Sequence, residues 1–191
     1  NVVEFVFENK IIKIENPDPN ETILNYVRLN LKKTGTKEGC AEGGCGACTI
    51  VLGEIKGNEI SYKSINSCIT FLPALNGKQL ILIENLSSEN GKLHCVQNAM
   101  VNFHGSQCGF CTPGFVMSMF AMFKNNKNIN DELINDSLSG NLCRCTGYRP
   151  IIDASKSLNN LSRKDHFDQN KKITLMLLKK IAKKKYRNFK K

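Results

Sequence analysis

The stretch that decides the fold is CAEGGCGAC, residues 40–48, which places three cysteines at short intervals on a backbone with few side chains. Together with Gly39, the run holds four glycines in ten residues. A disulfide needs two thiols and no glycines, and a zinc site usually spaces its thiols as pairs. Whether the run is a metal-binding loop therefore depends on the six cysteines found elsewhere in the chain.

Length and composition limit the possible number of domains and the class of protein. The chain of 191 residues has room for one domain or two small ones, and 41% hydrophobic residues suffice for a core. It shows no apolar run of about 18 residues, so no membrane span is expected. Its first residues lack the pattern of a signal peptide. Nine cysteines without such a signal favour metal or redox chemistry in a reducing compartment, and we expect the protein in the cytoplasm.

The net charge of +10 is concentrated at one end of the chain. Residues 162–191 hold twelve basic and two acidic residues, which leaves fifteen of each sign in residues 1–161. Because residues 1–161 carry no net charge, specific nucleic-acid binding by this part of the chain is not expected. We interpret 162–191 as a solvated linker remnant that leads towards a further domain. The alternative is a basic amphipathic helix that binds anionic lipid or RNA.

The first half of the chain reads as an α+β domain. Residues 2–15 alternate apolar and polar on both sides of Glu8–Lys10, which predicts a hairpin. Asn20 is the expected cap of a short helix. A second hairpin at 48–62 and a last strand within 78–86 complete a β-grasp domain that ends near residue 84.

The second half reads as helices. Thr112 is the expected N-cap of a helix with Pro113 in its first turn, and its Met and Phe side chains are expected in the core. The four predicted helices lie within 92–103, 112–123, 130–140 and 148–161. They predict an all-α four-helix domain over 88–161.

The first cysteine set consists of Cys40, Cys45, Cys48 and Cys68. Its spacing is C-x4-C-x2-C followed by nineteen residues and a cysteine, which is typical of a plant-type ferredoxin with a [2Fe–2S] cluster. The glycines permit positive φ and bring backbone N–H groups close to sulfur. The loop is therefore predicted to wrap a cluster.

The second set consists of Cys108, Cys111, Cys143 and Cys145. Its spacing, C-x2-C, thirty-one residues and C-x-C, suits either structural zinc or a second [2Fe–2S] cluster. Both pairs precede predicted helices, whose N-termini stabilise thiolates. The presence of the first set favours a [2Fe–2S] cluster over zinc at the second set, because two neighbouring redox centres can exchange electrons.

Three stretches carry a resemblance to a known family: EGCAEGGCGACTIVL, HGSQCGFCTPGFVMSMF and GNLCRCTGYRPI. They resemble the iron–sulfur portion of the xanthine oxidase family of molybdenum hydroxylases. The resemblance covers residues 2–161 in the family's order and is strongest to the small subunit of bacterial xanthine dehydrogenases. It implies a ferredoxin-like domain followed by a helical domain, each with one [2Fe–2S] cluster.

The resemblance also implies a function, that of an electron-transfer subunit with no catalytic residue of its own. A molybdopterin-bearing partner subunit would oxidise an aromatic heterocycle or aldehyde using water. Electrons would then pass through the helical-domain cluster, the ferredoxin-like cluster and FAD on a partner or further domain. By this likeness the second cysteine set lies nearer molybdenum, and Gln107 and Cys145 contact the pterin.

Alternatives remain at this point. The complex could be a related aldehyde, carbon monoxide or aromatic-heterocycle dehydrogenase. From other classes, the chain could be a free-standing ferredoxin carrier or a zinc-stabilised binding protein. Cys95 belongs to neither set and is interpreted as a buried thiol. His94 and His104 are expected to pack or cap a helix, and Phe110 either joins the core or shields a cluster.

Overall fold

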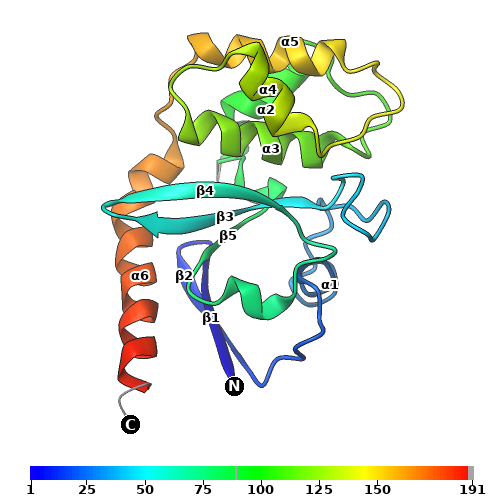
Figure 1. The fold of residues 1–191 in the computed structure, drawn as a ribbon. Helices are drawn as coiled ribbons and strands as arrows, with labels where there is room; N and C mark the ends of the chain where they lie inside the picture. The colour runs from blue at the N-terminus through cyan, green and yellow to red at the C-terminus, as the bar shows by residue number, and fades with distance from the viewer. Residues whose placement is uncertain (89, 189–191) are drawn as a thin grey trace.

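The computed structural model describes residues 1–88 and 90–188, and for 184–188 the course of the helix alone. Four helices, α2 to α5, form a layer over one side of a mixed β-sheet, and a long helix, α6, begins below this layer and runs down beside the sheet (Figure 1). The elements are β1 (Val2–Phe7), β2 (Lys10–Glu15), α1 (Ile23–Asn25), η1 (Tyr26–Asn30), β3 (Thr49–Lys56), β4 (Glu59–Asn66), η2 (Leu72–Leu75), β5 (Gln79–Ile81), η3 (Ile83–Asn85), α2 (Cys95–Asn102), α3 (Thr112–Asn125), α4 (Asp131–Leu138), α5 (Arg149–Ser157), η4 (Leu158–Asn160) and α6 (His166–Asn188).

The sheet has five strands in the order β2-β1-β5-β3-β4. Two antiparallel hairpins, β1–β2 and β3–β4, are joined through β5, which pairs parallel to β1 and antiparallel to β3. One face packs on α1 and η1 around Phe5, Ile23 and Leu72, all of which are fully buried. Both predicted hairpins and the β-grasp class are thus confirmed.

The cap of the first helix differs from the prediction. Thr22, not Asn20, accepts a hydrogen bond from the Asn25 N–H at 3.2 Å and so caps α1. Asn20 is engaged in the preceding turn, where its N–H donates to Asp18 at 2.8 Å. The chain therefore completes one Asx turn before the helix begins.

The centre of the helical layer is α3, which is buried at every residue from 114 to 123. One face of this helix contacts α2 and α4, and the other lies on β3 and β4. Tyr62 of β4 packs edge-on against Phe120 with ring centroids 5.6 Å apart. The predicted Met and Phe core is confirmed, but it is shared with the sheet, because the exposed face of a β-hairpin needs a cover.

The start of α3 also differs from the prediction. The helix begins at Thr112 itself, Cys111 stands at the N-cap, and the Thr112 hydroxyl donates to Ser106 at 2.8 Å. By contrast, the helix predicted within 130–140 forms as α4, and Asn130 caps it by accepting from the Leu133 N–H at 2.9 Å. The helix predicted within 148–161 forms as α5, with Pro150 in its first turn.

The expectation of a solvated tail is wrong for the part that forms α6. Phe167 belongs to the core under the helical layer, and Leu178 and Ile181 pack on Val6 of β1. These side chains lie on one face of the helix, whereas Lys172, Lys179 and Lys180 are exposed. The described part of the helix is therefore amphipathic and buries its apolar stripe on the sheet.

A buried ionic cluster holds the start of α6. Asp165 lies 3.0 Å from His94 Nε2 at the head of α2 and 3.0 Å from Lys124 Nζ at the end of α3. Burial alone would lower the pKa of His94, but its hydrogen bond to the Asp165 carboxylate raises the pKa to about 9. Burial would raise the pKa of Asp165, but His94 and Lys124 lower it. Asp165 is therefore held as a carboxylate between two basic partners, and His94 occupies the N-cap position of α2.

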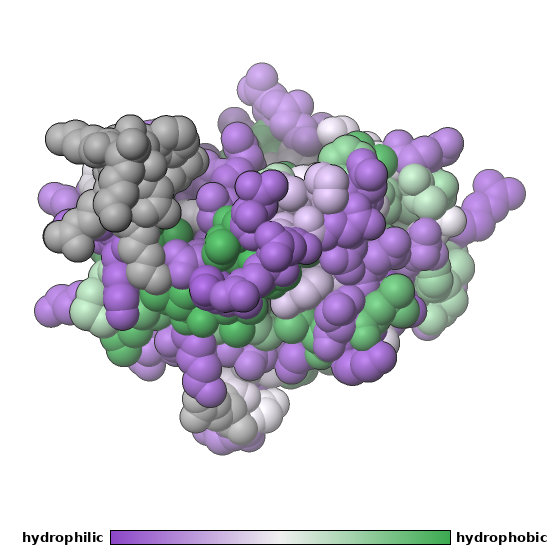
Figure 2. Space-filling view, turned by 90° about the horizontal axis from the view of Figure 1, so that it is seen from below, coloured by the Kyte–Doolittle hydropathy of each residue, from purple (hydrophilic) through white to green (hydrophobic). Residues whose placement is uncertain are grey.

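The face of the molecule away from the helical layer is seen from below in Figure 2. It presents mainly polar side chains, with apolar side chains gathered between them. Within the described part of the chain, no helix combines the length and hydrophobicity that crossing a bilayer requires.

We predict that Asp165→Asn destabilises the whole protein. The substitution leaves His94 without its carboxylate partner and takes from the Lys124 ammonium, whose side chain is 4% exposed, the more buried of its two carboxylate partners. Loss of one member of a buried ion cluster costs about 3–5 kcal/mol in the free energy of unfolding. The matched control is Asp168→Asn, because Asp168 also bonds Lys124 but is 43% exposed and is expected to cost about 1 kcal/mol or less. Urea unfolding of both variants measures the difference, and equal losses would contradict the role assigned to Asp165.

Candidate metal centres

The first cysteine set gathers where Leu24 of α1 packs beside the ends of β3 and β4. Cys48 immediately precedes β3 and Cys68 follows β4 by two residues, so antiparallel pairing of Thr49 with Asn66 brings both cysteines to one end of the hairpin. Their sulfurs lie 3.3 Å apart, and both residues are buried. Burial raises the pKa of the Cys68 thiol to about 12. Metal binding here must therefore displace a proton.

The glycine-rich loop wraps the thiol of Cys40. Backbone N–H groups of Glu42, Gly44 and Cys45 donate to its sulfur at 3.5, 3.3 and 3.3 Å. These amides hold the pKa of Cys40 down at about 7. A Cβ on Gly39 would stand 2.7 Å from the Cys45 sulfur, so only glycine fits there. The loop thus provides negative sulfur with N–H donors, as a cluster requires.

The second cysteine set lies at the N-terminal ends of α3 and α5. Cys108 raises the pKa of the Cys145 thiol, and Cys143 adds to the raised pKa of Cys111, so the four thiols interact most strongly as two pairs. Burial raises the pKa of Cys111 to about 12. Cys108 and Cys145 are exposed, and so is Gln107 beside them. The outer pair faces the surface and the inner pair the core.

In both sets the close thiol contacts join two cysteines at a time. Among residues 1–88 and 90–188, no three His, Cys, Asp or Glu side chains converge on one ion position. A single zinc ion needs four ligands around one point, whereas a two-iron cluster takes its four thiolates two per iron. The donor chemistry and this pairing fit a [2Fe–2S] cluster better than zinc at each set.

The two sets are joined by a seam of direct contacts between their loops. The Leu142 N–H donates to the Cys45 carbonyl at 2.9 Å, so one residue and one hydrogen bond separate Cys143 from Cys45. Asn141, 4% exposed, donates to the Gly46 carbonyl at 3.0 Å. Its side-chain carbonyl accepts from the Ser118 hydroxyl at 2.7 Å. Asn141 therefore ties α3 and the second set to the first loop.

The backbones meet so closely that the seam tolerates no side chain. A Cβ on Gly114 of α3 would lie 2.2 Å from the Gly46 carbonyl oxygen. Gly46 itself has a φ of +70°, and a Cβ there would lie 2.2 Å from the Gly140 oxygen. The Phe110 ring, 46% exposed, lies beside Gly39 and covers the gap between the loops.

Several residues of this seam were not singled out in the sequence. Asn141 and Leu142 stand inside the GNLCRC motif, but a motif does not show which neighbour is buried against another loop. His104, one of the histidines considered, is exposed with a φ of +53°. Cys95 lies 3.6 Å from His94 Nδ1 and packs against the core, apart from both sets.

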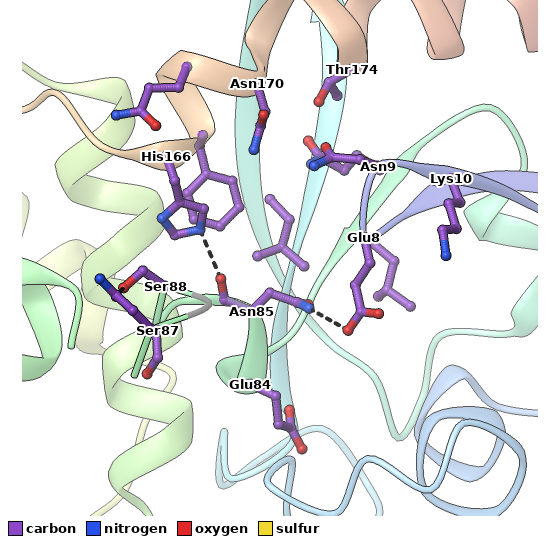
Figure 3. Close-up of a pocket in the computed structure, with 16 residues that line it drawn as sticks. Glu8, Asn9, Lys10, Glu84, Asn85, Ser87, Ser88, His166, Asn170 and Thr174 are labelled. Carbon is purple, nitrogen blue, oxygen red and sulfur yellow. Dashed lines mark hydrogen bonds between the residues drawn. The ribbon is translucent and has the colours of Figure 1, made fainter. Parts of the chain in front are cut away.

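A hollow of about 990 Å³ lies elsewhere, between the turn of the first hairpin, residues 84–88 and the start of α6 (Figure 3). His166 bonds the Asn85 carbonyl oxygen at 3.0 Å across it, and the Asn85 amide donates to Glu8 at 3.2 Å. No cysteine lines this hollow. We assign it to the joint between α6 and the sheet rather than to either cysteine set.

Comparison with known proteins defines the class of site. Residues 6–72 match the model of a 2Fe-2S iron-sulfur cluster binding domain, and residues 82–156 match that of a [2Fe-2S] binding domain. The chain is thus a protein with two [2Fe–2S] domains, a ferredoxin-like domain followed by a helical one.

The particular family follows from individual relatives. The chain is 50% identical over 149 residues to a xanthine dehydrogenase of Blastobotrys adeninivorans, covering 76% of this chain and 10% of that protein. It matches a quinoline 2-oxidoreductase chain of Pseudomonas putida 86 with a TM-score of 0.67 and 31% identity, covering 82% and 90% of the two chains. An aldehyde oxidoreductase of Desulfovibrio gigas matches with a TM-score of 0.71 and 31% identity, covering 87% and 18%.

The chain therefore belongs to the xanthine oxidase family of molybdenum hydroxylases and forms its iron–sulfur electron-transfer part. It spans about a tenth of the length of the curated relatives it matches.

We predict that Asn141→Ala loosens the seam. The substitution removes the partner of the buried Ser118 hydroxyl, and one unsatisfied buried group costs about 1–3 kcal/mol. It also removes one of the hydrogen bonds to the Gly46 carbonyl, which keeps those from Thr49. The control is Asn135→Ala on the exposed face of α4, where we expect a change within about 0.5 kcal/mol. Thermal unfolding of the two variants measures both effects. Equal stability of the two variants would show that Asn141 does not hold the domains together.

Proposed function

We propose that this chain carries electrons away from the molybdenum centre of a molybdenum hydroxylase through two clusters in series. The observation that supports this most directly is the seam, in which Leu142 and one hydrogen bond connect Cys143 to Cys45. Short covalent and hydrogen-bonded connections couple redox centres better than open space does. Each cysteine set supplies four thiolates, and when bound the clusters supply one-electron acceptor chemistry.

We further propose the ligands residue by residue. Cys40, Cys45, Cys48 and Cys68 would hold the first cluster, and Cys108, Cys111, Cys143 and Cys145 the second. The corresponding division of the chain is a ferredoxin-like domain at 1–84 and a helical domain at 88–161, with 162–191 as the following linker. The packing of α6 against both domains suggests that this linker also clamps them.

The direction of electron flow follows from exposure. Gln107, Cys108 and Cys145 lie on the surface at the second set, so this is the side on which a pterin-bearing subunit can approach. In this proposal Gln107 and Cys145 contact the pterin. Electrons pass inward to Cys143, cross the seam to Cys45 and leave towards FAD and NAD or another acceptor. The chain itself holds clusters, excludes water and docks; no acid, base or nucleophile is required of it.

The substrate of the whole complex is proposed from the relatives' names. Xanthine dehydrogenase is the name of the 50% identical relative, which favours an aromatic heterocycle of the purine type. The quinoline and aldehyde oxidoreductases are the alternatives that share this architecture. Nine free thiols in the described structure favour the cytoplasm as the compartment.

The proposal predicts the metal content of the anaerobically prepared protein. We expect about four iron atoms per chain, two for each cysteine set, with acid-labile sulfide and no stoichiometric zinc. Cys45→Ser should halve the iron and remove one EPR signal. The matched control is Cys95→Ser, because Cys95 lies outside both sets and should leave the iron content unchanged.

Two further results decide the proposal. A molybdopterin-containing partner should co-purify with the chain and reduce both clusters when its substrate is added. Zinc in place of iron would contradict the proposed centres, and full clusters that no such partner reduces would favour a free-standing carrier.

A further inference from the structure

The loop that carries the inner ligand of the second set has an unusual backbone. Two successive residues, Gly147 and Tyr148, both adopt a φ of +67°, in the left-handed region. For tyrosine this conformation costs roughly 1–2 kcal/mol, so other contacts must stabilise it. Tyr148 is also the N-cap of α5 but forms no side-chain cap. Its conformation serves the loop before it rather than the helix after it.

The phenol of Tyr148 folds back onto Cys143. Its oxygen accepts the Cys143 N–H at 3.0 Å, and its ring packs edge-on against Phe115 of α3 at 6.2 Å. The Cys143 amide is thereby occupied by the phenol oxygen. Residues 143–148 thus form a closed loop anchored on the core.

Inside this loop the hydroxyl of Thr146 lies 3.1 Å from the Cys143 sulfur. The same oxygen accepts the backbone N–H of Tyr148 at 3.2 Å. An iron-bound thiolate carries no proton, so in this contact the hydroxyl must be the donor and sulfur the acceptor. The Tyr148 N–H engages the oxygen's lone pair and leaves its hydrogen free to point at sulfur.

We propose that Thr146 sets the reduction potential of the second cluster through an O–H···S hydrogen bond to Cys143. This inference rests on the proposed function, because it takes Cys143 as an iron ligand. Reduction adds negative charge that is shared by the ligand sulfurs, and a hydrogen bond to sulfur becomes stronger as that charge grows. The hydroxyl therefore stabilises the reduced cluster and raises its potential. A higher potential favours electron entry at this cluster.

A matched pair of substitutions separates this role from a structural one. Thr146→Val keeps the branched shape and removes the hydroxyl, whereas Thr146→Ser keeps the hydroxyl. Thr112→Val is the control, because Thr112 also adjoins a proposed ligand, Cys111, but donates to Ser106 and not to sulfur. Should the valine variant at 146 lose iron, Thr146→Ala takes its place.

The experiment is an EPR-monitored redox titration of the full chain with its iron content measured in parallel. We expect Thr146→Val to lower the equilibrium constant for one-electron reduction of the second cluster about tenfold, which lowers its reduction potential by about 59 mV. Thr146→Ser should restore most of the shift, and Thr112→Val and the first cluster should stay at wild-type values.

Two outcomes overturn the inference and are distinguishable. Full iron with an unchanged potential in Thr146→Val, or an equal shift in Thr112→Val, refutes the role of the hydroxyl and leaves the proposed function standing. A wild-type chain without iron at the second set refutes the proposed function and this inference together.

Discussion

The contact between the two cysteine loops is the constraint on which the rest of the structure depends. Backbone meets backbone at the Leu142–Cys45 hydrogen bond and at Gly114 and Gly46, where not even a methyl group has room. Such close approach is possible only if both domains are held rigidly, because a shift of a few tenths of an ångström would break or overpack the seam. The buried amide of Asn141 satisfies the polar groups that this approach takes out of water.

Two features outside the seam keep the domains in that position. The helix α3 packs on the β3–β4 hairpin, so the helical domain and one face of the sheet share a core, while the other face of the sheet keeps its own core with α1 and η1. The second feature is α6, whose apolar face lies on β1 and whose first residues enter a buried cluster of charges with α2 and α3. Part of what the sequence presents as a basic tail therefore acts as a strap across both domains.

The sequence predicts those features that local pattern determines. Alternation shows both hairpins, and cysteine spacing alone selects eight of the nine cysteines and divides them into two sets. The sequence does not predict contacts between distant segments. Asn141 and the Gly46 carbonyl are 95 residues apart, and nothing near either residue marks the other as its partner. The packing of α6 had a local signal, since Phe167, Leu178 and Ile181 share a face, but its high charge favoured a solvated segment. The two expected caps differ because the side chains had other partners: Thr22 caps α1 in place of Asn20, and the Thr112 hydroxyl donates to Ser106 while Cys111 occupies the N-cap of α3.

The central claim is that the seam makes two clusters one electron path, and their magnetic interaction tests it most directly. In the fully reduced chain each cluster carries an unpaired spin, and spins held this close split each other's EPR lines. The account predicts split signals when both clusters are reduced and unsplit signals when only one is. Unsplit signals from a fully reduced chain with its complete iron content would contradict it, because the two centres would then be too far apart for the seam to connect them.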